Sequence, residues 1–130
     1  MIVLALSVLP GTFAICRLSH TAAMPDWAAS GDFISITRTR DELSIVCVDH
    51  DIPADAKCNR GWRCFKVEGP LDLALTGVLS SLAAPLAEAR INFFAISTFD
   101  TDYLLVKEQN LTRAVAVLSQ AGHAVRSFME

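Results

Sequence analysis

The fold of this chain is decided by residues 76–122, which read TGVLSSLAAPLAEARINFFAISTFDTDYLLVKEQNLTRAVAVLSQAG. Apolar residues recur there with the period of a helix, then in short runs typical of strands, and then again with a helical period. Gly77 begins the first helix, and Gly122 follows the second at a position where glycine is favoured. Between the strands, a polar turn concentrates hydroxyls and carboxylates in apolar surroundings. The order of elements and this turn together predict a small-ligand sensor rather than a catalyst.

Both helices of this stretch are amphipathic. The first is predicted at about 77–90, where Pro85 removes one backbone donor and bends the helix. The second begins at Asn110, a good N-cap residue, and stops at Gly122. Strands are expected at 91–97, 103–107 and 124–128. The apolar faces consist of Val78, Leu79, Leu82, Leu86 and Ala89 in the first helix, and of Leu111, Ala114, Val115, Leu118 and Ala121 in the second.

The first sixty residues read as strands with one short helical turn. Runs at 2–8 and 12–18 are expected to form a hairpin about the Pro10–Gly11 turn. A helical turn near residues 25–29 closes at Gly31. The elements expected after it are a second hairpin from 33–39 and 43–48, a loop at 52–60 that ends at Gly61, and a strand at 62–68.

An internal repeat relates the two halves. A shift of 60 residues lays FISITRTRDELSIVC (33–47) over FFAISTFDTDYLLVK (93–107), with matching hydrophobic pattern and hairpin tip. The first half has only a turn where the second has a full helix. Two degenerate copies of a β-α-β-β-α-β unit explain this pattern. We therefore expect an α+β fold of two ferredoxin-like βαββαβ units, with antiparallel sheets covered by helices on one face. Residues 1–61 form the abbreviated unit and residues 62–130 the complete one.

Composition and charge limit the classes of binding partner that are expected. The 130 residues are 52% hydrophobic and only 19% charged, with a mean hydropathy of +0.40. A short chain with this many apolar residues either buries its strands on both faces or covers apolar surface with another subunit. The formal charge is −3 and no run of Lys or Arg occurs, so a nucleic-acid partner is not expected.

The N-terminal residues MIVLALSVLPGTFAIC resemble an export signal only superficially. They lack a positively charged start, and Pro10–Gly11 breaks their apolar run. No apolar run approaches the roughly 20 residues of a membrane span. A cytoplasmic protein without a membrane partner is therefore expected.

The four cysteines, Cys16, Cys47, Cys58 and Cys64, form no CxxC pair. Cys16 and Cys47 lie in apolar, strand-like runs, where a free thiol behaves as a small hydrophobic group. The spacing supplies no zinc site. We expect four buried structural thiols; a Cys58–Cys64 disulfide is an alternative, disfavoured in a reducing cytosol.

The start of the first helix is one candidate binding element. A glycine lets the backbone turn tightly out of the preceding strand and leaves the first helical N–H groups free. With the positive end of the helix dipole, which contributes about 0.3–1 kcal/mol, those donors suit a carboxylate or phosphate. Many helix starts satisfy these donors with side chains or water instead, so the signal is weak alone. The candidate residues are Thr76, Gly77, Val78, Leu79 and Ser80.

The polar turn is the second candidate element. Asp100 and Asp102 suit an ammonium or guanidinium group, and Phe99 offers an apolar or cation–π wall. A solvated hairpin, in which Asp and Thr satisfy their own backbone, is the alternative reading. Together, a helix start that attracts carboxylates and a turn that attracts cations match the two ends of a free amino acid. The candidate residues are Ile96, Ser97, Thr98, Phe99, Asp100 and Asp102.

Three segments carry a resemblance to a known family. They are SITRTRDELSIVC (35–47), RGWRCFKVEGPLDLALTGVLSSLAAPLAEA (60–89) and FAISTFDTDYLLVKE (94–108). They resemble the ACT domain, a βαββαβ module that senses small ligands, and in particular the tandem-ACT proteins related to aspartokinase regulatory domains and to cytosolic arginine sensors. The resemblance covers nearly the whole chain and is specific in the second half.

The resemblance implies a regulatory amino-acid-binding protein whose pocket lies between ACT units, and a homodimer. It implies that Gly77, Val78 and Ser80 meet the ligand's carboxylate side, and that Thr98, Phe99 and Asp102 meet its amine or side chain. Ser80 stands where the arginine-sensing relatives have an acidic residue, so arginine specificity does not transfer.

Catalytic residues, cofactors and metal ions are not expected. The sequence holds no nucleophile elbow and no Walker or Rossmann glycine pattern. Two carboxylates two residues apart, Asp100 and Asp102, need no acid–base partnership. His20 and His50 read as surface histidines, and His123 as a residue at a helix end, where a cation is favoured. The alternative function is a ligand-free ACT-like module that docks a protein partner.

Overall fold

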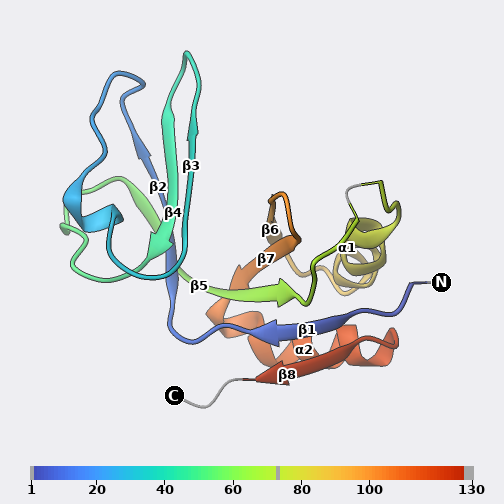
Figure 1. The fold of residues 1–130 in the computed structure, drawn as a ribbon. Coiled ribbons are helices and arrows are strands. Elements are labelled where there is room, and N and C mark those ends of the chain that lie inside the picture. Colours follow the sequence, from blue (N-terminus) through green and yellow to red (C-terminus); the bar gives the residue numbers. More distant parts are fainter. Residues whose placement is uncertain (1, 73, 128–130) are drawn as a thin grey trace. The chain divides into compact units, whose positions relative to one another are not determined.

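A computed structural model describes residues 2–72 and 74–127 of the chain. The chain folds into two compact units: one combines residues 1–10 with residues 63–130, and the other consists of residues 11–62. The backbone passes between them at Pro10–Gly11 and within strand β5 (Cys58–Val67), as Figure 1 shows.

The unit of residues 1–10 and 63–130 contains a sheet in the order β6-β7-β5-β1-β8. Its strands besides β5 are β1 (Ala5–Val8), β6 (Phe93–Ser97), β7 (Asp102–Lys107) and β8 (Ala124–Ser127). Strand β1 pairs antiparallel with β5 and parallel with β8, so that Leu6 lies opposite both Val67 and Val125. The N-terminal strand therefore separates β5 from β8, the first and last strands of the βαββαβ order.

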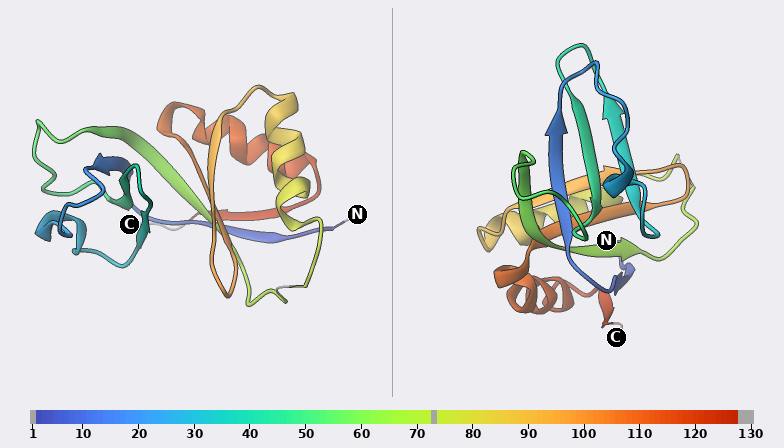
Figure 2. Two further views of the ribbon diagram at one scale, coloured as in Figure 1. Left: turned by 90° about the horizontal axis from the view of Figure 1, so that it is seen from above. Right: turned by 90° about the vertical axis from the view of Figure 1, so that its left-hand side faces the viewer.

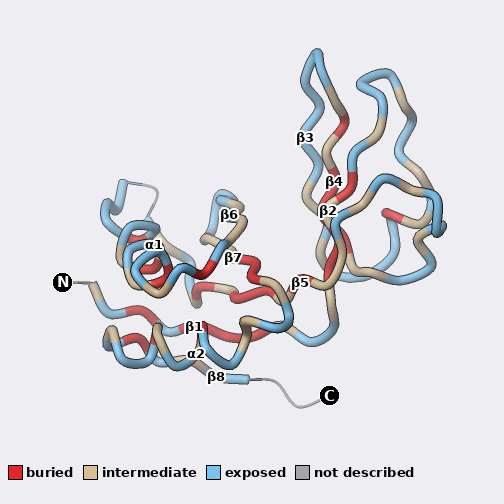
Figure 3. The backbone as a smooth tube through the Cα atoms, turned by 180° about the vertical axis from the view of Figure 1, so that it is seen from behind, coloured by how far each residue is buried: buried red, intermediate tan, exposed pale blue. Residues whose placement is uncertain are grey.

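Two α-helices cover one face of this sheet, α1 (Val78–Glu88) and α2 (Leu111–Gln120), and the 3-10 helix η2 (Glu108–Asn110) leads into α2 (Figure 2). Alternate strand residues point to the same face, and these pack with the helices in one apolar core. Figure 3 shows buried segments in the strands and in both helices of this unit. None of the helices that the structure describes is long and apolar enough to cross a bilayer. The buried core residues are Leu4, Leu6, Val8, Phe65, Val67, Val78, Leu82, Leu86, Ile91, Leu104, Val106, Ala114 and Leu118.

The unit of residues 11–62 has an antiparallel sheet in the order β3-β4-β2-β5. Its further strands are β2 (Phe13–Leu18), β3 (Ile34–Arg38) and β4 (Leu43–Val48). Residues 11–62, all of them described, contain one short 3-10 helix, η1 (Asp26–Ala28), and no α-helix. Ala28, Leu43, Ile45 and Cys47 form its buried cluster.

The predicted α+β class with ferredoxin-like units is confirmed. The repeated segments each form a hairpin, β3–β4 in one unit and β6–β7 in the other. The division of the chain differs from the predicted one at residue 61, because residues 1–10 belong with residues 63–130. The expected hairpin of 2–8 with 12–18 is wrong, since β1 pairs with β5 and β8, whereas β2 pairs with β4 and β5. The predicted strand end at Phe128 lies outside the described residues.

Strand β5 begins earlier than predicted, at Cys58 rather than Trp62. Its register against β2 shifts between the pairs Phe13–Trp62 and Ile15–Asn59, which leaves one extra residue on β5. Gly61 lies in this irregularity with φ +81°, a backbone conformation that favours glycine. The glycine therefore marks a bulge within a strand, although it reads in the sequence as the end of a loop.

The cysteines differ from the prediction in one pair. Cys16 and Cys58 form a disulfide, whereas Cys47 and Cys64 are free and buried, as expected. The predicted alternative pairing of Cys58 with Cys64 is wrong. The expectation of four free thiols is also wrong for Cys16 and Cys58, because the antiparallel pairing of β2 with β5 places Cys16 directly opposite Cys58.

The proline inside α1 is compensated by a histidine from another element. Pro85 has no N–H, so the carbonyl of Ser81, four residues earlier, lacks its helical donor. The Nε2 atom of buried His123 lies 3.0 Å from this carbonyl oxygen, and the Leu4 N–H donates to His123 Nδ1 at 3.1 Å. Since Nδ1 accepts, Nε2 carries the proton and donates to Ser81. The reading of His123 as a cationic helix-end residue is therefore wrong, because its ring links α1 to the start of β1.

We predict that His123→Ala lowers the free energy of unfolding by about 2–4 kcal/mol, because it leaves the buried Leu4 N–H and the part-buried Ser81 carbonyl without these partners. Denaturant unfolding measures the change. The exposed His20→Ala is the matched control and should stay within about 0.5 kcal/mol of the wild type.

A double-mutant cycle separates this compensation from simple packing. Pro85→Ala restores an N–H for the Ser81 carbonyl, so His123→Ala should cost about 1 kcal/mol less in that background. Equal costs in both backgrounds would contradict the compensation.

Candidate functional site

A cavity of about 580 Å³ opens within the unit of residues 1–10 and 63–130. Its walls come from the loop after β5, from the first two turns of α1, and from the turn between β6 and β7. The residues that line it are Leu71, Asp72, Leu75, Gly77, Val78, Leu79, Ser80, Ala83, Ser97, Thr98, Phe99, Asp100, Thr101 and Asp102.

The helix start contributes backbone donors to this cavity. Gly77, the N-cap residue of α1, has φ +85°, a conformation that favours glycine. No side chain among the described residues caps the helix, and the Ser80 hydroxyl instead donates to the Gly77 carbonyl at 3.2 Å. The N–H groups of the first turn have no partner inside the helix, so they are available to an anion in the cavity.

The turn between β6 and β7 is closed by Thr98. Its N–H and its hydroxyl both donate to the Thr101 carbonyl, at 2.8 and 2.9 Å, and the Thr101 N–H donates back to the Thr98 hydroxyl at 3.3 Å. The alternative reading therefore holds for Thr98, whose side chain satisfies its own turn. The carboxylates of Asp100, exposed, and Asp102, half-buried, line the cavity.

Two contacts fix this turn beside the loop after β5. The buried Thr101 hydroxyl donates to the Val67 carbonyl, the last residue of β5, at 2.6 Å. The Leu71 N–H donates to the Asp100 carbonyl, also at 2.6 Å. A Cβ atom at Gly69 would lie 3.1 Å from the Asp100 oxygen and 3.0 Å from the Leu71 nitrogen, so this approach requires glycine.

The charges in the cavity are arranged by sign. Three carboxylates line it, those of Asp72, Asp100 and Asp102, whereas none of its lining residues is Lys, Arg or His. The positive partial charge comes from the N-terminus of α1. A molecule with one anionic and one cationic group matches this arrangement.

The mouth of the cavity carries exposed apolar side chains. Phe99 is 80% exposed, Leu75 47% and Leu79 39%, and all three line the cavity. Large apolar side chains that gather at one opening are typical of a surface that another molecule covers.

The structure brings together nine of the eleven predicted site residues and leaves two aside. Thr76 and Ile96 do not line the cavity. Sequence reasoning missed Leu71, Asp72, Leu75, Ala83 and Thr101. The sequence signal that could have found the loop residues was Gly69 and Asp72, which follow the predicted strand at 62–68. Thr101 lies inside the polar turn that is the second candidate binding element.

Among the described residues, no group of three or more His, Cys, Asp and Glu side chains is arranged to hold a metal ion.

Two family models match the chain. A model described as the ACT domain matches residues 57–120. A second model, described as an N-terminal domain, matches residues 11–55.

The curated relatives are described as cytosolic arginine sensor for mTORC1 subunit 1. The mouse protein is 39% identical over 124 residues, which covers 84% of this chain and 38% of that protein. The human protein is 34% identical over 67 residues, or 51% of this chain and 20% of that protein. The chain thus spans two-fifths or less of the length of these relatives.

Solved structures give a closer match. A protein from Agrobacterium tumefaciens superposes with a TM-score of 0.94 at 42% identity, over 100% of this chain and 97% of that one. Aspartate kinase from Synechocystis superposes with a TM-score of 0.67 at 16% identity, over 98% of this chain and 28% of that one, which shows a shared fold.

We predict that Thr101→Val lowers the free energy of unfolding by about 1–3 kcal/mol, because the Val67 carbonyl loses its buried donor. Thermal or denaturant unfolding measures the loss. Thr112→Val, at an exposed position of α2, is the isosteric control and should change stability by less than about 0.5 kcal/mol. Equal losses in the two variants would mean that the hydroxyl of Thr101 does not anchor the turn.

Proposed function

Because the chain is a member of the ACT-domain family, we propose that it binds a free amino acid in the cavity beside α1 and acts as a regulatory protein without catalysis. The observation that carries the proposal is the separation of charge within one cavity. The start of α1, which no side chain among the described residues caps, lines the same cavity as Asp100 and Asp102.

The ligand's two charged groups have matching partners. Its carboxylate accepts from the N–H groups of Val78, Leu79 and Ser80, where the helix dipole adds to the hydrogen bonds. Its ammonium group donates to Asp102 and Asp100, in charge-assisted hydrogen bonds that are stronger than neutral ones. The names of the curated relatives, as arginine sensors, support an amino acid as the ligand class. A cytoplasmic location accords with those same names.

We predict that calorimetric titration with each of the common amino acids gives binding heat for one or a few of them. Asp102→Asn should weaken this binding by about 10- to 100-fold, because it removes a charge-assisted bond. Asp55→Asn, in the exposed loop before β5, is the matched control and should bind as the wild type does.

The helix start is tested by a pair of variants at one position. Gly77→Asn and Gly77→Asp strain the left-handed backbone to a similar extent, because their side chains have nearly the same size and shape, but only the aspartate places a negative charge at the anion site. Binding should therefore fall more in Gly77→Asp than in Gly77→Asn. Absence of heat with every amino acid, in a folded sample, would refute the amino-acid ligand.

We further propose that a second copy of the chain covers the mouth of the cavity, so that the protein is a homodimer. The exposed Phe99, Leu75 and Leu79 are the apolar rim that such a copy would bury. A copy seated there would exclude water from the ligand, so ligand binding and dimerisation should strengthen each other.

We predict that Phe99→Ser raises the dimer dissociation constant by about tenfold or more, in line with the loss of a buried aromatic anchor. Sedimentation or light scattering with and without the amino acid measures this change. Ile36→Ser, an exposed apolar position of β3 in the other unit, is the control and should leave the dissociation constant unchanged.

The alternative function is a protein-docking module that binds no ligand. The same apolar rim favours it, since docking needs the rim and not the carboxylates. In that case Phe99→Ser abolishes association, while Asp102→Asn and every amino acid leave it unchanged.

A further inference from the structure

The disulfide of the unit formed by residues 11–62 joins two neighbouring strands at directly opposite positions. Cys16 and Cys58 face each other across β2 and β5, with Cα atoms 4.1 Å apart. The neighbouring pair is joined by a backbone bond, since the Arg17 N–H donates to the Lys57 carbonyl at 2.9 Å. Cys16 and Cys58 therefore form a non-hydrogen-bonded pair, the closely spaced kind. The ladder holds the two sulfur atoms together, so the bond can open and close without moving the strands.

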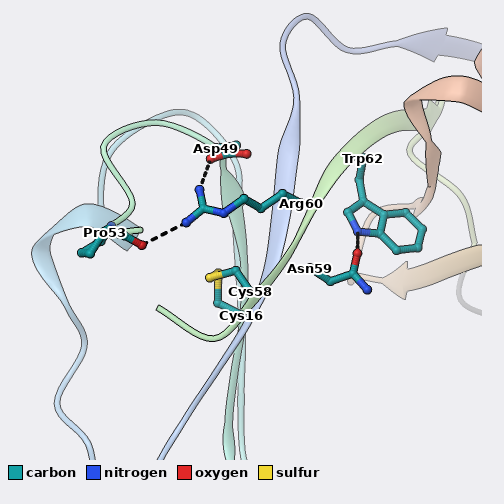
Figure 4. Close-up of a disulfide and its surroundings, with 7 residues drawn as sticks. All are labelled: Cys16, Asp49, Pro53, Cys58, Asn59, Arg60 and Trp62. Atoms are coloured by element: carbon teal, nitrogen blue, oxygen red, sulfur yellow. Dashed lines mark hydrogen bonds and ion pairs between the residues drawn. A yellow bond between two sulfur atoms is a disulfide. The ribbon is translucent and has the colours of Figure 1, made fainter. Parts of the chain in front are cut away.

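The two sulfur atoms differ in access. Cys58 is half-buried, whereas Cys16 is 2% exposed. Both line a cavity of about 460 Å³. An incoming thiolate therefore reaches the Cys58 sulfur first, and the Cys16 sulfur, held inside, is the leaving group. Figure 4 shows the pair beside Asn59 and Arg60, with Arg60 turned to Asp49 and the Pro53 carbonyl.

The charges around this cavity favour thiolates. Arg17, Lys57 and Arg60 line it, opposed by the single carboxylate of Glu42. Asp49 pairs with Arg60 at 2.8 Å, so Arg17 and Lys57, both exposed, supply the excess positive charge. Nearby cations stabilise the thiolate of a cysteine, and they attract an incoming small thiol that carries a negative charge.

The other two thiols are chemically protected. Cys47 and Cys64 are fully buried. Burial raises the pKa of the Cys64 thiol to about 12, and burial together with the Asp49 carboxylate raises the pKa of Cys47. Since the thiolate is the nucleophile, neither reacts in the folded chain.

We propose that the Cys16–Cys58 pair is a reversible thiol–disulfide exchange site for small anionic thiols, with Cys58 as the sulfur that is attacked. A thiolate RS⁻ attacks Cys58, forming an R–S–S–Cys58 bond and releasing the Cys16 thiolate. A second RS⁻ attacks the sulfur of R, releasing RSSR and the Cys58 thiolate, and both thiolates take protons from water. Two thiols are oxidised and the protein disulfide is reduced by two electrons.

Trapping variants test the order of attack. The reduced full chain carrying Cys16→Ser or Cys58→Ser is incubated with oxidised glutathione, and adducts are followed by intact mass. Cys16→Ser should gain one glutathione on Cys58, and Cys58→Ser should react about tenfold more slowly, because Cys16 is buried. Equal rates, or adducts on Cys47 or Cys64, would overturn the proposal.

The wild-type chain supplies a test that needs no variant. After reduction, oxidised glutathione should remove two titratable thiols and leave two that react with Ellman's reagent only in denaturant. Loss of none, or of all four, would overturn the proposal. If a trapping variant exposes the buried thiols without denaturant, this measurement decides alone.

The preference for anionic thiols is tested by comparing the reduction rates of the disulfide by two small thiols of opposite charge. The folded disulfide is reduced with thioglycolate, which is anionic, and with cysteamine, which is cationic, at equal thiolate concentrations. Thioglycolate should react faster, and Lys57→Gln should lower the ratio of the two rates. Arg40→Gln, at the exposed tip between β3 and β4, is the matched control. A ratio that Lys57→Gln leaves unchanged would refute the preference for anionic thiols.

Discussion

The unit that holds the cavity beside α1 depends on the insertion of β1 between β5 and β8. The backbone of this strand bonds on both sides: the Glu68 N–H donates to the Ala5 carbonyl at 2.8 Å, and the Ala124 N–H to the Leu4 carbonyl at 2.9 Å. The side chains of Leu6 and Val8, and that of Leu4 just before the strand, are buried in the core. Without β1, two facing strand edges would lose their partners and the helices would lose the middle of their support.

The same strand also supports the helix that begins the cavity. Leu4 donates to His123, and His123 donates to the carbonyl that Pro85 leaves free in α1. A buried polar ring is tolerated because both of its nitrogen atoms are satisfied. The position of α1, and with it the direction of its first N–H groups, is thus set partly by a residue that follows the second helix. The turn between β6 and β7, by contrast, is held by hydrogen bonds of Thr98 and Thr101.

Local patterns predicted most of the residues that line this cavity, because its parts are local. The helix start and the turn between β6 and β7 each consist of consecutive residues, and their meeting follows from the βαββαβ order. The pairing of β1 was not predictable in this way, since an apolar run carries no information on which distant strand it joins. The Cys16–Cys58 disulfide was not predicted for the same reason, because β2 and β5 are neighbours only in the folded chain. His123 was misread because the missing donor at Pro85 and the histidine that replaces it are far apart in sequence.

The disulfide and the proposed cytoplasmic location together constrain the chemistry of Cys16 and Cys58. In a reducing compartment a disulfide persists only transiently, so a fold that needed the bond would fail there. Here β2 pairs with β5 through a backbone ladder and with β4 on its other side, so backbone bonds as well as the sulfur bridge hold these strands. The strand pairing therefore has support besides the bridge, and the bridge can respond to the thiols around it. The buried pair, Cys47 and Cys64, has the opposite property, since burial removes both its reactivity and its access. The chain thus holds two kinds of cysteine: Cys16 and Cys58 line a cavity, whereas Cys47 and Cys64 lie in the core. In both cases the position of the cysteine sets the reactivity of its sulfur.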